Sequence, residues 1–267
     1  MSKIKTKFLE LKSKKQKALI AYIVAGYPNE AGTLAAVRGL VKGGADIIEL
    51  GLPFSDPLAD GPVIQNASYQ ALKKGINLAK FISLVKKIRK ETNLPLVLMT
   101  YTNLLFKHGY DKFISLTRKA GIDGFILPDM PIEEAKEYLK AIHKNHADAI
   151  FLISPNTSED RVRKIVKACS GFLYLVSVYG TTGKQQEIQQ YTIRAIKNAR
   201  KIVDGRIPLA VGFGVSDPQQ AKLIIKNGAD GVIVGSAFLR LIANLSQKEI
   251  EPKVASFARN LKAATKS

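Results

Sequence analysis

Short apolar runs and longer amphipathic segments alternate along the whole chain. Eight of the runs are apolar at nearly every position and show little alternation of apolar and polar residues. Such runs are typical of parallel strands that are covered on both faces. The predicted strands are Leu19–Val24, Ile47–Leu50, Leu96–Thr100, Gly124–Leu127, Ala149–Ile153, Phe172–Val176, Leu209–Gly212 and Gly231–Val234.

The segments between these runs have the periodicity of helices. Thr33–Lys42 and Glu133–Asn145 carry apolar residues at three- and four-residue spacing, which predicts amphipathic helices. Pro218 is predicted to be the first residue of another helix, with Ser216 and Asp217 before it as candidate caps.

Three of the predicted strands are preceded by Gly-Ala-Asp or Gly-Ile-Asp. These tripeptides are Gly44–Asp46, Gly121–Asp123 and Gly228–Asp230. Glycine readily takes the left-handed conformation that ends a helix. Each tripeptide therefore predicts a helix that turns directly into the next strand.

The alternation of strands and helices predicts the fold class. Eight such units with short turns indicate a (β/α)8 TIM barrel, formed as a single domain by residues 1–267. An open, doubly wound sheet is the alternative. The spacing of Ile4, Phe8 and Leu11 predicts an extra N-terminal helix, which we expect to plug the N-terminal end of the barrel.

Composition narrows the class of protein. With 46% hydrophobic residues the chain can bury a full core, and its single cysteine, Cys169, excludes an internal disulfide framework. The setting of Cys169 at a predicted helix end favours a buried thiol over a nucleophile. Residues 1–8 have no apolar signal region, and no stretch approaches the roughly 18 apolar residues of a membrane span. We expect a cytoplasmic protein with no membrane partner.

The net charge of +19 raises the question of nucleic acid binding. The basic residues within 86–90 and 161–167 lie on the polar faces of predicted amphipathic helices, without interleaved aromatic residues or a known nucleic-acid motif. We therefore expect no nucleic-acid partner. The charge can still steer anionic substrates such as phosphate esters.

One carboxylate stands where barrel enzymes place their chemistry. Glu49 ends the second predicted strand, and by the two-residue period it shares a face with Ile47 while Ile48 and Leu50 face the helices. An inward carboxyl group among aliphatic residues should be hard to ionise, which suits acid–base chemistry near neutral pH. A structural carboxylate that accepts backbone hydrogen bonds is the alternative.

A second carboxylate, Asp60, follows in a loop stiffened by three prolines, and Asp56 lies in the same loop. Aspartates in such turns usually bond to their own backbone, so each is weak evidence alone. Together with Glu49, Asp60 can form a site for proton transfer without metal or cofactor.

Two small-residue turns follow the last two predicted strands. They contain Phe213 and Gly214 in one turn, and Gly235 and Ser236 in the other. Free backbone N–H groups at the starts of helices bind anions, and this pair of turns is the usual phosphate site of a barrel. Simple turn glycines are the alternative interpretation of each turn.

Residues 49–66, Glu-Leu-Gly-Leu-Pro-Phe-Ser-Asp-Pro-Leu-Ala-Asp-Gly-Pro-Val-Ile-Gln-Asn, resemble the signature of the tryptophan synthase alpha chain family nearly letter for letter. The resemblance runs the length of the chain. It implies that Glu49 and Asp60 are the catalytic carboxylates and that Asp56 serves contact or loop structure. The substrate-pocket residues that it implies are Tyr22, Met99, Tyr101, Asp129 and Tyr174.

The resemblance also implies a lid loop after the sixth strand, with Thr182 and Gly183 in its Thr-Gly pair. Many members have valine and arginine where this chain has Thr181 and Gln185. These departures affect the details of lid closure.

The reaction that the resemblance implies is retro-aldol cleavage of indole-3-glycerol phosphate to indole and D-glyceraldehyde 3-phosphate. Glu49 would move protons at carbon 3 of the indole and at the side-chain hydroxyl, and Asp60 would bond the indole N–H. Residues 213, 214, 235 and 236 would hold the phosphate. No cofactor is implied, and the expected partner is a tryptophan synthase beta subunit in an alpha2-beta2 heterotetramer.

Other interpretations stay open at this point. An enzyme that releases free indole without a beta subunit shares the same catalytic residues, and a non-catalytic chain could mainly dock on and activate a beta subunit. His143 and His146 are three residues apart at a predicted helix end, but no third ligand is near, so we expect surface histidines and no metal.

Overall fold

The computed structural model describes residues 1–176, 185–212 and 214–266, and of residues 185–189 only the backbone. In this part of the chain nine parallel strands form one sheet, in the order β5-β4-β3-β2-β1-β9-β8-β7-β6. The strands are β1 (Ala18–Val24), β2 (Ile47–Gly51), β3 (Leu96–Met99), β4 (Gly124–Ile126), β5 (Asp148–Ile150), β6 (Leu152–Ile153), β7 (Leu173–Val176), β8 (Leu209–Gly212) and β9 (Gly231–Val234).

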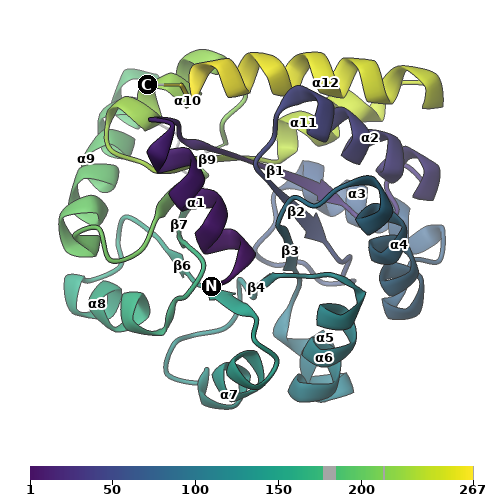
Figure 1. Cartoon of the computed structure of the whole chain (residues 1–267), viewed down its shortest axis with the longest axis horizontal. Coiled ribbons are helices and arrows are strands. Elements are labelled where there is room, and N and C mark those ends of the chain that lie inside the picture. Colours follow the sequence, from purple (N-terminus) through teal and green to yellow (C-terminus); the bar gives the residue numbers. More distant parts are fainter. Residues whose placement is uncertain (177–184, 213, 267) are drawn as a thin grey trace.

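Helices surround this sheet (Figure 1). They are α1 (Lys3–Ser13), α2 (Glu30–Gly43), α3 (Pro62–Lys73), α4 (Leu78–Glu91), α5 (Thr102–His108), α6 (Tyr110–Ala120), α7 (Lys136–Lys144), α8 (Glu159–Ala168), α9 (Gln185–Val203), α10 (Pro218–Lys226), α11 (Ser236–Ala243) and α12 (Gln247–Ala264). Among the described residues, no helix combines the length and apolar character that a membrane span needs.

The sheet curls until its two end strands meet in one stretch of chain. β5 pairs with β4, β6 pairs with β7, and only Phe151 separates β5 from β6. The predicted strand Ala149–Ile153 is thus divided into two short strands that bond to opposite neighbours. The barrel architecture is confirmed, and the open doubly wound sheet is excluded.

Two other boundaries can be compared with the prediction. The helix predicted from Glu133 begins at Lys136, because the preceding residues form turns: Glu134 N–H bonds to the Pro131 carbonyl, three residues back. The helix predicted at Pro218 begins there, and Asp217 caps it by accepting from the Gln220 N–H at 2.9 Å.

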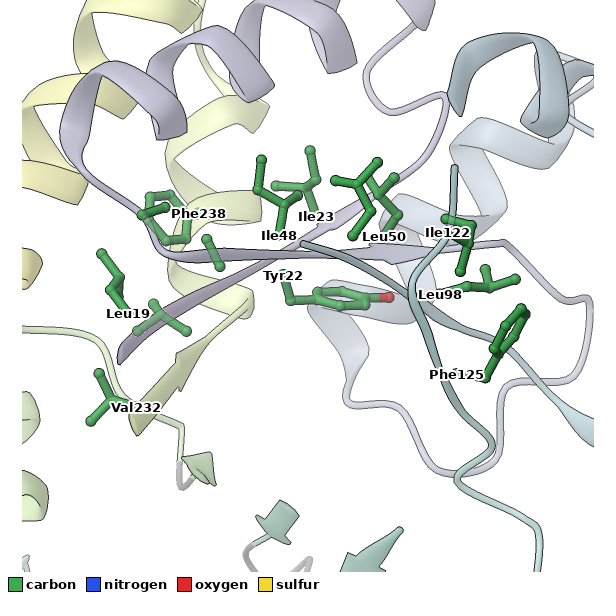
Figure 2. Packing of buried hydrophobic residues seen from close by; sticks show 14 of the residues in the cluster. Leu19, Tyr22, Ile23, Ile48, Leu50, Leu98, Ile122, Phe125, Val232 and Phe238 are labelled. Carbon is green, nitrogen blue, oxygen red and sulfur yellow. The ribbon is translucent and has the colours of Figure 1, made fainter. Parts of the chain in front are cut away.

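The two faces of the strands carry different cores. Ile23, Ile48 and Leu50 lie on the side of the helices, whereas the ring of Tyr22 lies on the opposite, inner side (Figure 2). The two-residue period of strands produces this division. Glu49 lies in register with Tyr22 and faces inward as predicted.

The extra N-terminal helix is confirmed as α1, which crosses the barrel in Figure 1. Its buried residues Ile4, Phe8 and Leu11 pack in one cluster with interior residues of the strands. Phe8 lies against Phe172 with ring centroids 6.0 Å apart. The α1 helix therefore covers this end of the barrel, opposite the carboxyl ends of the strands where barrel enzymes place their sites.

Candidate active site

A cavity of about 740 Å³ opens at the carboxyl ends of the strands. Of the residues expected from the sequence to form the site, it is lined by Tyr22, Glu49, Asp60, Met99, Tyr174, Gly214, Gly235 and Ser236. The tertiary structure therefore brings the two carboxylates and the described parts of both glycine turns into one cavity.

Glu49 is buried at the acid end of this cavity. Its side chain is 1% exposed, and neither carboxylate oxygen has a hydrogen-bond partner among the described residues. Burial, and then the negative charge of Asp60, raise the pKa of Glu49 to about 8. A buried carboxyl group without partners is costly to ionise, so Glu49 holds its proton at neutral pH. No backbone amide of the described residues bonds to Glu49, as a structural carboxylate would require.

Asp60 comes from the loop between β2 and α3. Burial raises the pKa of its carboxyl group to about 6, and a hydrogen bond from the Tyr101 hydroxyl counteracts part of this rise. The Tyr101 hydroxyl also accepts the Ala59 N–H at 3.0 Å, and its ring stacks on Phe54 at 5.3 Å. Tyr101 thereby contacts the loop at Phe54, Ala59 and Asp60. Asp60 is the more readily ionised of the two acids.

The two tyrosines of the cavity lie over glycines of neighbouring strands. A Cβ atom at Gly51 would lie 2.3 Å from the Tyr22 hydroxyl oxygen, and one at Gly212 would lie 2.8 Å from the Tyr174 hydroxyl oxygen. Since no Cβ atom fits at such distances, glycine at each strand end makes room for a phenol over the floor of the cavity.

The opposite end of the cavity suits an anion. Gly235 is the N-cap of α11 and Ser236 its first residue, so free backbone N–H groups begin there. Gly214 has a φ of 67°, and no described atom outside its chain neighbours lies within 4 Å of the place that a Cβ atom would take, so its backbone is accessible. The two carboxylates and this turn thus give the cavity an acid end and an anion-binding end.

Two residues expected in the pocket are not among those that line the cavity. Tyr101 lies against the 51–60 loop, as described above. Asp129 is exposed and accepts hydrogen bonds from the Thr102 N–H at 3.0 Å and the Thr102 hydroxyl at 2.9 Å. It therefore caps the start of α5 from the loop after β4.

Some expectations fall on residues that the structure does not describe. These are Phe213 in the phosphate turn and Thr182 and Gly183 in the expected lid. They remain predictions.

Other lining residues were not predicted from the sequence. Ser154, Asn156 and Thr157 follow β6, and Arg240 lies one helical turn beyond Ser236 on α11. A short polar loop after a predicted strand could have been noted for the first three. Arg240 could have been found from its i, i+4 spacing to Ser236, which puts both on one helix face.

The remaining candidates lie outside the cavity. His143 and His146 are exposed, and the described residues contain no group of three or more histidine, cysteine or acidic side chains suited to a metal. Cys169 is buried, its thiol donates to the Phe172 carbonyl at 2.9 Å, and burial raises its pKa to about 12. Such a thiol is not a nucleophile.

Comparison with known proteins agrees with this geometry. A family model described as tryptophan synthase alpha chain matches residues 8–266. The tryptophan synthase alpha chain of Methanosarcina barkeri is 44% identical over 264 residues, covering 99% of this chain and 97% of the relative. That of Petrotoga mobilis is 45% identical, covering 98% and 99%.

Solved structures match over similar lengths. A chain of tryptophan synthase from M. tuberculosis superposes with a TM-score of 0.86 at 33% identity, covering 99% of this chain and 100% of that one. A chain of the tryptophan synthase complex from Pyrococcus furiosus gives 0.84 at 36% identity, covering 92% and 98%.

Proposed function

The chain belongs to the tryptophan synthase alpha chain family, and we propose that Glu49 and Asp60 perform the bond cleavage of that family. The protein is a carbon–carbon lyase of L-tryptophan biosynthesis. It cleaves indole-3-glycerol phosphate to indole and D-glyceraldehyde 3-phosphate. The observation that carries the assignment is the pair of buried carboxyl groups in one cavity, with pKa values raised to about 8 and about 6.

Glu49 starts the reaction as an acid. Its proton goes to carbon 3 of the indole, which leaves a positive charge spread over the ring and its nitrogen. The resulting Glu49 carboxylate then takes the proton of the hydroxyl on the adjacent chain carbon. The carbon–carbon bond breaks, its electron pair returns to the ring, and the chain oxygen becomes the aldehyde oxygen.

Asp60 acts as the ionised partner. Its carboxylate accepts a hydrogen bond from the indole N–H and stabilises the positive charge of the protonated ring. The hydrogen bond from Tyr101 favours this ionised form, because it lowers the pKa of Asp60. An uncharged amide at position 60 cannot supply the same stabilisation.

The phosphate of the substrate binds at the opposite end of the cavity. Gly214, Gly235 and Ser236 present backbone N–H groups there, and the sequence predicts that Phe213 contributes as well. Arg240, which also lines the cavity, adds a positive charge at this end. Tyr22, Met99 and Tyr174 hold the indole. Thr182 and Gly183 are predicted from the family resemblance to belong to the lid.

A tryptophan synthase beta subunit receives the indole, in an alpha2-beta2 heterotetramer in the cytoplasm. Two exposed apolar side chains on segments that follow the carboxyl ends of β2 and β3 support such a partner: Leu58 is 92% exposed and Phe106 77% exposed. The bond from Ala59 to Tyr101 joins the two segments that carry them. Exposed apolar side chains that form a contiguous patch mark interaction surfaces.

The test is indole release from indole-3-glycerol phosphate by the purified chain, with and without a beta subunit. Glu49→Gln should lower the turnover at least about 1,000-fold and leave ligand affinity nearly intact. Asp60→Asn should also be strongly impaired. Glu137→Gln on exposed α7 is the control and should behave as wild type.

Each outcome decides one point. Fast release by the chain alone would favour a free-standing indole-releasing lyase. No release by the wild type in either condition would overturn the assignment. Normal turnover of Glu49→Gln would remove Glu49 from the mechanism, and unchanged activity of Asp60→Asn would reduce Asp60 to loop structure.

A further inference from the structure

The side chain of Tyr22 spans the floor of the cavity between its two ends. A Cβ at Gly235, in the anion-binding turn, would lie 3.1 Å from Cδ1 of the ring, and one at Gly51, two residues after Glu49, would lie 2.3 Å from the hydroxyl oxygen. The base of the ring is therefore next to the phosphate turn, and its hydroxyl is at the acid end. Close contact at both points fixes the direction of the ring.

The hydroxyl of Tyr22 is placed beside the reacting acids. Tyr22 is the register partner of Glu49 across β1 and β2, is 5% exposed and lines the cavity. Burial first, and then the charges of Asp60 and Glu49, raise the pKa of its phenol well above the ordinary value. The group therefore stays protonated and can donate one hydrogen bond.

The substrate must lie along this ring. Its phosphate binds at the turn that holds Gly235, and its indole lies at the carboxylates, so the carbon chain between them crosses Tyr22. The chain carbon whose bond breaks carries a hydroxyl group next to the indole. We propose that the Tyr22 hydroxyl donates a hydrogen bond to this chain oxygen, which makes Tyr22 a further catalytic residue; the proposal rests on the proposed function.

The hydrogen bond acts on charge that appears during the reaction. When Glu49 takes the proton from the chain hydroxyl, the oxygen gains negative charge before it becomes the aldehyde oxygen. A donor that is already oriented stabilises this charge more than it stabilises the neutral hydroxyl, so it speeds the chemical step. Tyr22 keeps its own proton throughout, and no atom is transferred to or from it.

The test replaces one oxygen atom. Tyr22→Phe should keep the ring and lower kcat about 10- to 100-fold, with KM changed less than about threefold. Indole-3-propyl phosphate, which has the same skeleton without the two chain hydroxyls, should bind the variant and the wild type with equal Kd. Tyr69→Phe on α3, where the side chain is 53% exposed, is the matched control and should not change kcat.

The outcomes separate this proposal from the proposed function. A wild type that releases no indole would overturn the proposed function itself. If the wild type is active and Glu49→Gln is not, a kcat for Tyr22→Phe within about twofold of wild type would overturn the role of Tyr22 alone. Weaker binding of indole-3-propyl phosphate to Tyr22→Phe would also overturn it, since the hydroxyl would then only shape the cavity.

Discussion

Glu49 and Asp60 have similar ordinary pKa values, and their surroundings separate them. Glu49 has no hydrogen-bond partner among the described residues and faces the charge of Asp60, whereas Asp60 accepts a bond from Tyr101. Between pH 6 and 8 Glu49 is mostly protonated and can act as an acid, whereas Asp60 is mostly ionised and can act as a base. Two carboxyl groups with separated pKa values in one cavity are the arrangement that general acid–base catalysis requires.

This difference predicts the pH dependence of the reaction. The free enzyme needs ionised Asp60 and protonated Glu49, so kcat/KM should rise as the pH passes about 6 and fall as it passes about 8. The second ionisation of the substrate phosphate, near about 6, adds to the rising limb, so the falling limb is diagnostic. Steady-state rates from about pH 5 to about pH 10 check this, and a rate that stays level above about 9 would contradict the role of Glu49 as the acid.

At the scale of elements, the turns from helix to strand close the base of the barrel. Gly44, Gly121 and Gly228 have φ values of 85°, 126° and 107°, which few other residues adopt. The aspartate two residues later accepts an N–H from the first or second residue of a neighbouring strand in each case: Leu19 to Asp46 at 2.7 Å, Leu96 to Asp123 at 3.0 Å and Leu209 to Asp230 at 3.1 Å.

Each of these aspartates also meets a cation from an outer helix. Lys262 lies 2.7 Å from Asp46, Arg200 lies 2.7 Å from Asp230, and Arg89 bonds to Asp123. Each tripeptide therefore connects three elements at the closed end of the barrel: the strand that it precedes, a neighbouring strand and an outer helix. Its role is stability, which is typical of residues at this end of a barrel.

Removal of one such aspartate should destabilise the fold and leave the chemistry intact. Asp46→Ala should lower the free energy of unfolding by about 3–5 kcal/mol, because Lys262 loses its carboxylate partner and the buried Leu19 N–H loses its acceptor. Denaturant unfolding measures this change. Glu137→Ala, which breaks an exposed pair with Lys140, is the control and should leave stability unchanged. Equal stability of both variants would show that the Asp46–Lys262 ion pair is dispensable for the stability of the fold.

At the scale of the whole molecule, the two ends of the barrel have different surfaces. The N-terminal end is closed by α1, whereas the carboxyl end carries the cavity and the exposed side chains Leu58 and Phe106. A partner that receives indole must approach the end that holds the cavity. The apolar side chains there are therefore the place to test the docking of a beta subunit.

Phe106→Asp should weaken the docking of a beta subunit at least about tenfold, because it places a charge on the proposed docking surface. The indole release of the isolated chain should not change, since Phe106 does not line the cavity. Titration of beta-stimulated activity measures the affinity. Leu9→Asp on α1, where the side chain is 46% exposed at the opposite end, is the matched control. Equal affinity of both variants would place the partner elsewhere.

Local patterns in the sequence determined the frame of this protein. Leu209–Gly212 and Gly231–Val234 are strands with the predicted bounds, since apolar residues between turn-forming ones leave few alternatives. The two-residue period of strands predicted that Glu49 faces the barrel interior. The spacing of Ile4, Phe8 and Leu11 predicted the helix α1 that covers the N-terminal end. Residues 49–66 were enough to indicate the family, because a long motif in one loop needs no knowledge of distant contacts.

Only the tertiary structure decided how distant segments meet. Tyr101 reaches the loop of Asp60 across 42 residues, Asp129 caps α5 outside the cavity, and Arg240 lines its anion-binding end. Contacts between distant segments also produce the burial that separates the pKa values of Glu49 and Asp60, and they place Tyr22 in the space that Gly51 leaves. Periodicity reports on neighbours along the chain, whereas a pKa or a hydrogen bond depends on the atoms that folding brings within a few ångströms.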